Sequence, residues 1–188
     1  MHVDFNTIKH KISQHIPKKI SDNTSRHACV LMPLFYKESS LHLLLTKRTD
    51  SVEHHKGQIS FPGGMVDDTD TSPTHTALRE LEEEVGIKES SISILGQLDD
   101  IKIPSGFVVT PIVGFLNSLR DLMTNKDEVA EVIFIPIEKF FDRSLIHTEM
   151  RELNGITRQV YFYDVWKEPV WGATAHIIKQ FSDIISTK

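Results

Sequence analysis

Hydrophobic residues recur along this chain with two kinds of spacing, and these predict where helices and strands lie. Spacings of three and four residues, typical of a helix with one apolar face, occur near each end of the chain and once in the middle. The apolar residues at these helical spacings are Phe5, Ile8, Ile12 and Ile16 before Pro17, then Ala77, Leu78, Leu81 and Val85, and finally Ala175, Ile178, Phe181 and Ile185. We therefore expect three amphipathic helices.

Between these helices, alternating or continuous apolar runs indicate β-strands. The predicted strands are residues 28–36, 41–47, 91–98, 107–116, 129–135, 145–153 and 156–165. Asn154-Gly155 is a strong hairpin signal between the last two strands. The unbroken leucine run at residues 43–45 predicts a central strand, whereas Pro111 predicts a bulge or an edge position for its strand.

Strands before and after a central helix, with further helices at both ends, predict an α/β protein. The expected architecture is an α/β/α sandwich, in which helices cover both faces of a mixed β-sheet. The chain has 188 residues without an internal repeat, low-complexity tract or linker between domains, so we expect one domain. Within it, residues 1–25 supply an N-terminal helix and linker, and residues 26–188 supply the core.

The composition argues against several classes of protein. A hydrophobic share of 39% and a charged share of 25% are typical of soluble globular proteins. The net charge of −5 argues against nucleic acid or an anionic membrane as a partner. The sequence lacks an apolar run near the roughly 20 residues that span a bilayer, and it lacks a signal-peptide core. We expect a cytoplasmic protein, whose N-terminal helix packs on its own domain or on a partner subunit of a homodimer.

The middle helix carries an acidic face beside its apolar face. Its expected ends are marked by Ser72, Pro73 and Gly86. At about 100° per residue, Glu80, Glu83 and Glu84 share one arc of this helix. Neighbouring carboxylates repel each other by a few tenths of a kcal/mol per pair, so stability alone gives no reason to cluster them. A divalent cation would turn the repulsion into coordination.

Magnesium fits this demand, because it takes oxygen ligands, retains several waters and often shares its shell with substrate phosphates. Manganese is the alternative ion. Gly63 and Gly64 form a turn whose backbone can approach the same cation or phosphate. Arg79 can orient the carboxylates through charge-assisted hydrogen bonds. An acidic helix face that only contacts solvent is the alternative interpretation.

These residues resemble the signature of the Nudix hydrolases, a glycine followed by Arg-Glu-aliphatic-X-Glu-Glu-X-Gly-aliphatic. The matching positions are Gly64, Arg79, Glu80, Leu81, Glu83, Glu84, Gly86 and Ile87. The resemblance implies a Nudix-type sandwich and metal-dependent hydrolysis of a nucleoside diphosphate linked to another group. Two departures are visible, because Asp70 stands where the signature has glutamate and the segment 71–78 is one residue longer than usual.

The resemblance also implies roles for individual residues. Glu80 and Glu84 are expected to bind the metal, and Glu83 to be a further ligand or the base that activates water. A carboxylate from a loop is the alternative base. The candidates for that role are Glu131 and Glu128.

The sequence upstream of the signature resembles an additional motif of the coenzyme A pyrophosphatase branch. The matching segments are residues 44–49, Gly57 and residues 61–64. Glu53 departs from the motif, which has arginine there. The branch implies cleavage of coenzyme A to 3′,5′-ADP and 4′-phosphopantetheine. The residues expected to bind this substrate are Arg48, Lys56, Gly63 and Gly64.

Two other functions stay open at this point. Because Glu53 reverses a charge in the upstream motif, the substrate could instead be ADP-ribose or a dinucleoside polyphosphate. A non-catalytic nucleotide-sensing module is the alternative from another class. An incomplete acidic cluster would favour such a module, and the cluster here is complete.

Overall fold

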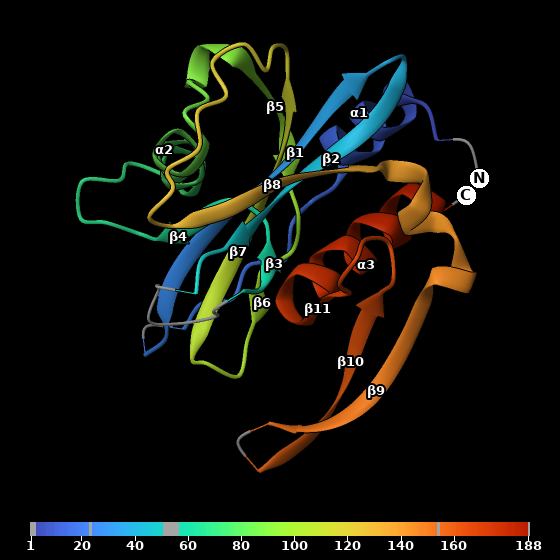
Figure 1. The fold of residues 1–188 in the computed structure, drawn as a ribbon. Helices are drawn as coiled ribbons and strands as arrows, with labels where there is room; N and C mark the ends of the chain where they lie inside the picture. The colour runs from blue at the N-terminus through green and yellow to red at the C-terminus, as the bar shows by residue number, and fades with distance from the viewer. Residues whose placement is uncertain (1–2, 23, 51–56, 154, 188) are drawn as a thin grey trace.

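The structure is a computed structural model that describes residues 3–22, 24–50, 57–153 and 155–187 (Figure 1). Its centre is an eight-stranded sheet with the strand order β3-β2-β1-β7-β5, in which β4 also pairs with β1, β6 with β7, and β8 with β2. These strands are β1 (Arg26–Lys37), β2 (Ser40–Arg48), β3 (Ile59–Ser60), β4 (Gly63–Met65), β5 (Ile92–Gln97), β6 (Ile101–Lys102), β7 (Phe107–Leu116) and β8 (Val129–Pro136). Strands β1 and β7 are parallel and the other pairs are antiparallel, so the predicted mixed sheet is confirmed.

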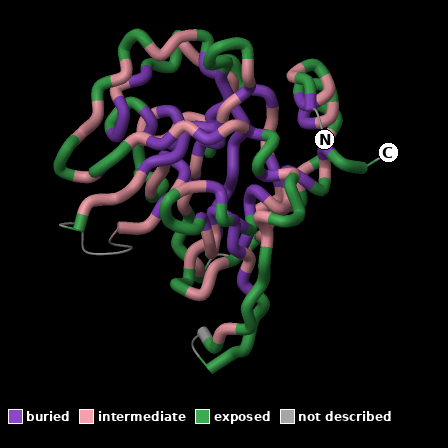
Figure 2. Tube along the Cα trace, turned by 45° about the vertical axis from the view of Figure 1, so that its right-hand side comes forward, coloured by how far each residue is buried: buried purple, intermediate pink, exposed green. Residues whose placement is uncertain are grey.

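Helices cover both faces of this sheet, as the sequence predicts (Figure 1). They are α1 (Phe5–Gln14), α2 (Pro73–Val85) and α3 (Gly172–Ser186). The apolar side of α2 packs with Cys29, Leu31 and Phe35 of β1 on one face. Residues of α1 and α3 share a second, larger core with the other face. Figure 2 shows the buried segments gathered between these layers. The α/β/α sandwich is therefore confirmed.

Two local predictions are wrong. Pro111 is neither at an edge nor in a bulge, because β7 lies between β1 and β5. Its carbonyl accepts a hydrogen bond from the Leu98 amide at 3.0 Å, beyond the end of β5 and before β6 begins. The missing N–H faces the same gap in the ladder, so an interior proline costs little here. Ile16 is 87% exposed, because α1 ends at Gln14 and the residue before Pro17 is biased away from helical geometry.

The leucine run at residues 43–45 is completely buried in β2, which lies between β1 and β8, so its central position is confirmed. Strands β9 (Ile146–Leu153), β10 (Ile156–Tyr163) and β11 (Val170–Trp171) form a separate three-stranded sheet. The β9–β10 hairpin projects from the rest of the chain as an arm (Figures 1 and 2). Among the described residues, no helix is both long and apolar enough to cross a membrane.

Candidate active site

The acidic helix α2 is fixed at both ends. Ser72 Oγ accepts a hydrogen bond from the His75 amide at 3.1 Å, and Pro73 occupies the first helical turn. Gly86 ends the helix with a φ of 73°, a conformation that glycine adopts without strain. The apolar side of the helix is buried against β1, and Glu80 and Glu84 lie against the glycines of β4.

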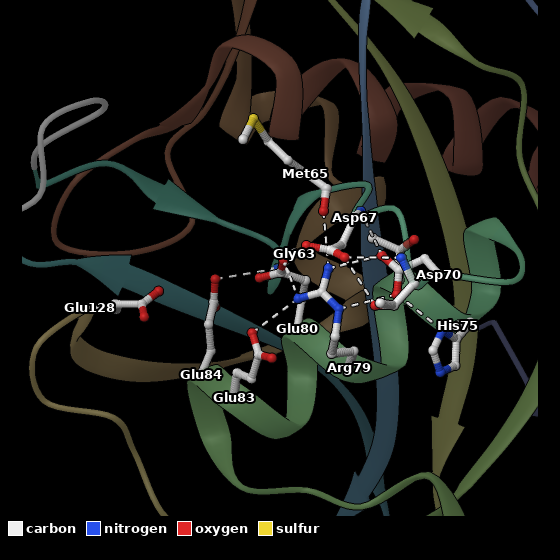
Figure 3. A network of polar contacts seen from close by, with 12 residues as sticks. Gly63, Met65, Asp67, Asp70, His75, Arg79, Glu80, Glu83, Glu84 and Glu128 are labelled. Carbon is white, nitrogen blue, oxygen red and sulfur yellow. Dashed lines mark hydrogen bonds and ion pairs between the residues drawn. The ribbon is translucent and has the colours of Figure 1, made fainter.

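Arg79 connects three carboxylates around this helix (Figure 3). Its Nε and Nη2 donate to the two oxygens of Asp70 at 3.1 and 3.0 Å. Its Nη1 donates to Glu80 Oε1 at 2.8 Å and to Glu83 Oε2 at 3.1 Å. A further bond from Nη2 to the Met65 carbonyl ties the guanidinium to β4 at 3.0 Å. Arg79 thus orients the carboxylates of α2 and also anchors the preceding loop.

Asp70 is the departure from the Nudix signature, and its environment accounts for it. The Asp70 amide donates to the Asp67 carbonyl, and the Asp67 amide donates to Asp70 Oδ2, so the loop forms a tight turn. This turn brings the short aspartate side chain to Nε and Nη2 of Arg79, where it is 0% exposed. The hydrogen bonds from Arg79 hold the pKa of Asp70 well below its usual range. The pair therefore stays ionised at neutral pH.

Glu84 is the most enclosed of the three glutamates on the acidic face of α2, with 3% of its side chain exposed. Its Oε1 lies 3.5 Å from the Gly63 amide nitrogen and 3.9 Å from Arg48 Nη1. Thr46 Oγ1 donates to its other oxygen at 3.5 Å. Burial raises the pKa of Glu84 to about 7, although Arg48 and the Gly63 amide act in the opposite direction.

The two glycines before α2 pack closely against their neighbours, Gly63 against the backbone of β1 and Gly64 against a side chain of α2. A Cβ at position 63 would overlap the Cys29 carbonyl, and one at position 64 would overlap the carboxylate of Glu80. Burial raises the pKa of Glu80 as well, and Arg79 opposes that shift. Backbone and carboxylate are thus brought together where a larger residue would separate them.

These groups border an open hollow of about 370 Å³. The lining residues are Arg48, Gly63, Gly64, Met65, Val66, Asp67, Arg79, Glu80, Glu84 and Glu128. Glu128 belongs to the segment that precedes β8, and Asn125 holds it there. Asn125 Nδ2 donates to Glu128 Oε1 at 3.2 Å, while the Asn125 amide donates to the Glu84 carbonyl at 2.9 Å. A distant loop is thus fastened to the acidic helix.

The candidates from the sequence do not all reach this hollow. Glu83 pairs with Arg79 but is 54% exposed and lies at the rim. Glu131 is exposed on β8, where it lies opposite Lys47, and it is not among the lining residues. Lys56 and Glu53 lie outside the described residues. Two residues that contact the glutamates of the site were not predicted from the sequence. Thr46 is one position of the upstream motif, and no sequence pattern marks Asn125.

The donor set fits a divalent cation that retains part of its water shell. Within the described part of the chain, no group of three or more acidic, histidine or cysteine side chains is placed to hold a metal ion. Arg79 holds Glu80 and Glu83 on one side, while Glu84 lies deeper beside Gly63. Glu80, Glu84 and Glu128 nevertheless line one hollow, where burial raises the pKa of the first two. A cation shared with substrate phosphates suits such an open set.

Comparison with known proteins identifies the family. The family described as NUDIX domain matches residues 25–154, well over half of the chain. The chain belongs to the Nudix family. Nudix hydrolases act on nucleoside diphosphate derivatives and generally use divalent metal ions. A Nudix hydrolase named NudL from Photorhabdus laumondii, described as uncharacterized, is 42% identical over 166 residues, 88% of each chain. The NudL protein of Yersinia enterocolitica is 38% identical over 94% of this chain and 89% of its own.

Solved Nudix structures share the fold at lower identity. A MutT/nudix family protein from Enterococcus faecalis has a TM-score of 0.58 at 20% identity, covering 97% of this chain and 69% of that one. The NUDIX domain of Shewanella oneidensis NrtR, solved in complex with ADP ribose, has a TM-score of 0.51 at 20% identity, covering 70% of this chain and 84% of that one. These similarities confirm the Nudix layout of sheet and helices.

Proposed function

We propose that this Nudix hydrolase cleaves the diphosphate of coenzyme A or its derivatives into 3′,5′-ADP and 4′-phosphopantetheine. The observation that carries the proposal is the position of the upstream motif. Thr46 and Arg48 of this motif lie beside Glu84, so the segment that resembles the coenzyme A branch borders the same hollow as the acidic helix. Motif and acidic cluster can therefore contact one substrate.

Arg48 and the glycine turn would bind the diphosphate. Arg48 lines the hollow, and its buried Nε has no hydrogen-bond partner among the described residues. A guanidinium that lies 3.9 Å from a carboxylate can donate hydrogen bonds to the oxygens of a phosphate. The Gly63 amide also points into this region. Lys56, which lies outside the described residues, is retained as a further substrate-binding residue.

Glu80 and Glu84 would hold Mg²⁺ or Mn²⁺, with Glu83 as a third ligand from the rim and the Gly64 backbone beside them. When bound, the ion neutralises the diphosphate and lowers the pKa of the attacking water. Arg79 keeps Glu80 and Glu83 in place through its shared Nη1. Asp70 in turn fixes the guanidinium from its other side.

Glu128 is the base that the geometry favours over Glu131 and Glu83. It lines the hollow, whereas Glu131 is exposed on β8 and Glu83 is held at the rim. Asn125 occupies only one of its oxygens, so the other can accept a proton. Water adds to one phosphorus, its proton passes to Glu128, and the bridging P–O bond breaks. Each product keeps one phosphate group of the cleaved diphosphate, and 3′,5′-ADP also carries the 3′-phosphate of coenzyme A.

Product analysis tests this proposal. The protein is incubated with magnesium and, separately, with coenzyme A, ADP-ribose or a dinucleoside polyphosphate, and the products are separated. We expect 3′,5′-ADP and 4′-phosphopantetheine from coenzyme A at the highest kcat/KM. Preferred cleavage of one of the other two substrates would reject coenzyme A while leaving Nudix hydrolysis intact.

ADP-ribose or a dinucleoside polyphosphate is the second candidate substrate, and Glu53 is the observation that favours it. An acidic side chain where the upstream motif has arginine removes one positive charge from the expected coenzyme A site. Glu53→Arg should then raise kcat/KM for coenzyme A relative to ADP-ribose. A nucleotide-sensing module without catalysis is disfavoured, because the carboxylates of the acidic helix are all present.

A further inference from the structure

The β9–β10 arm has an unprotected edge. Within the part of the chain that the structure describes, β9 pairs only with β10, and β11 pairs with β10 only at Phe162 and Tyr163. Beyond those two residues the arm is a two-stranded ribbon. Its outer residues are mostly exposed on both faces (Figure 2). A ribbon of two strands is marginally stable in water, and an edge with free N–H and C=O groups can pair with another strand.

The base of the arm, in contrast, is firmly braced. His147 stacks on Phe162, and Phe162 stacks on Trp171, with interplanar angles of 9° and 10°. The guanidinium of Arg151 lies 4.7 Å above Phe162 and 5.3 Å above Trp171. These contacts hold β9 in a fixed orientation with its outer edge facing away from β10. The base of the arm is therefore braced by these side chains.

Proline and lysine, which protect many sheet edges, are missing from β9. Residues 146–153 contain no proline or glycine, and their charges are of both signs. Inside the hairpin, Arg151 pairs directly with Arg158, which places two like charges opposite each other. A carboxylate on the open side of Arg151 would offset that repulsion. Glu149 of the same strand supplies one at 2.8 Å, and both side chains remain partly exposed.

The segment Glu149-Met150-Arg151 is complementary to itself in antiparallel register. A two-fold axis through Met150 places Glu149 opposite Arg151 of a second copy, and the relation holds in both directions. The two Met150 side chains, each 67% exposed in the single chain, then face one another. We propose that two copies of this chain associate by antiparallel pairing of their β9 strands about Met150, joining two three-stranded sheets into one six-stranded sheet.

Charge reversal tests the register. In Arg151→Glu, glutamates would face glutamates across the axis, and in Glu149→Arg, arginines would face arginines. Light scattering should therefore give the 21.5 kDa mass of one chain for each variant and twice that mass for the wild type. An equimolar mixture of the two variants restores opposite charges at every pair and should again give twice the mass. Circular dichroism of each variant checks that the arm still folds.

Cysteine cross-linking tests the axis itself, using the full chain. Met150→Cys places two thiols opposite each other at a spacing that a disulfide can span, so mild oxidation should yield a covalent dimer. Thr148→Cys is the matched control, because position 148 faces position 152 across the axis and its two copies lie apart. The native Cys29 is buried.

Three results would overturn the proposal. The first is a wild type with the mass of a single chain at all accessible concentrations. The second is a mixture of the charge variants that stays at that mass. The third is a dimer in which Thr148→Cys cross-links as readily as Met150→Cys, which would place the interface elsewhere.

Discussion

The two sides of the candidate active site are built in different ways. On one side, Asp70, Arg79, Glu80 and Glu83 come from one short stretch of chain and hold each other through ion pairs. On the other side, Arg48 of β2 and Glu128 before β8 come from segments far apart in the sequence. Local spacing on a helix determines the first side. The second side exists only because the sheet and the loop around Asn125 bring distant residues together.

Removing the carboxylate of Glu84, which belongs to α2 and lies near Arg48, should have the largest effect on turnover. Glu84→Gln is expected to lower kcat by about 10³-fold, since metal-assisted charge stabilisation contributes several kcal/mol. Stability should not fall. The pKa of Glu84 is raised to about 7, so the charged side chain weakens the folded state as pH rises through 7, and glutamine avoids that penalty. Turnover is measured with magnesium and melting temperature at pH 8. Full activity in the variant would remove Glu84 from the mechanism.

Separate substitutions of Glu128 and Glu131 show which of the two carboxylates is the general base. Glu128→Gln should lower kcat by about 10²-fold, in the range for loss of a general base, and Glu131→Gln should leave kcat nearly unchanged. Both changes keep the size of the side chain and remove one charge. If Glu131→Gln lowered kcat and Glu128→Gln did not, the base would be Glu131 of β8 and not the residue that lines the hollow.

A substitution of Asn125 tests whether the action of Glu128 depends on the hydrogen bond from the Asn125 side chain. Asn125→Ala removes the donor to Glu128 and is expected to lower kcat about tenfold, as is usual for a residue that orients a catalytic group. In a Glu128→Gln background the same change should have little further effect, because the group to be oriented is already lost. Additive losses in the double variant would mean that Asn125 acts independently of Glu128.

The smallest expected effect concerns how much the Asp70–Arg79 ion pair stabilises the fold at low pH. Because Arg79 lowers the pKa of Asp70 in the folded state, the pair stabilises the fold above the ordinary pKa of an aspartate. That contribution is lost as pH falls toward the lower folded pKa. Between pH 7 and pH 3, wild type should lose more free energy of unfolding than Asp70→Asn, by on the order of 1 kcal/mol. Urea titrations at both pH values measure it, and equal losses would argue against the buried ion pair.

Much of the local side could be predicted before the fold was known. Ser72, Pro73 and Gly86 mark the ends of α2, and the structure places a cap, a first-turn proline and a left-handed glycine there. The helical period predicted that Glu80, Glu83 and Glu84 share a face. It could not predict that Glu83 stays at the rim while Glu84 is buried, because burial depends on β2 and on the Gly63 backbone.

Residues outside this helix show the same dependence on the assembled sheet. Pro111 was expected at an edge, yet its carbonyl and missing donor face a gap between β5 and β6 that only the assembled sheet creates. Glu131 and Glu128 are equal candidates for a loop base from the sequence, and strand pairing with β2 places Glu131 on an exposed part of β8. In both cases the neighbouring strands of the sheet decide the environment of the residue.

The sequence by itself determined the α/β class, the acidic helix with its ends, and the membership in the Nudix family, because these depend on spacing within short segments. The tertiary structure alone decided which carboxylates are buried, that Thr46 and Arg48 lie against Glu84, and that Asn125 brings Glu128 to the hollow. Burial and contacts between distant segments arise only when the sheet forms, so no local pattern could reveal them.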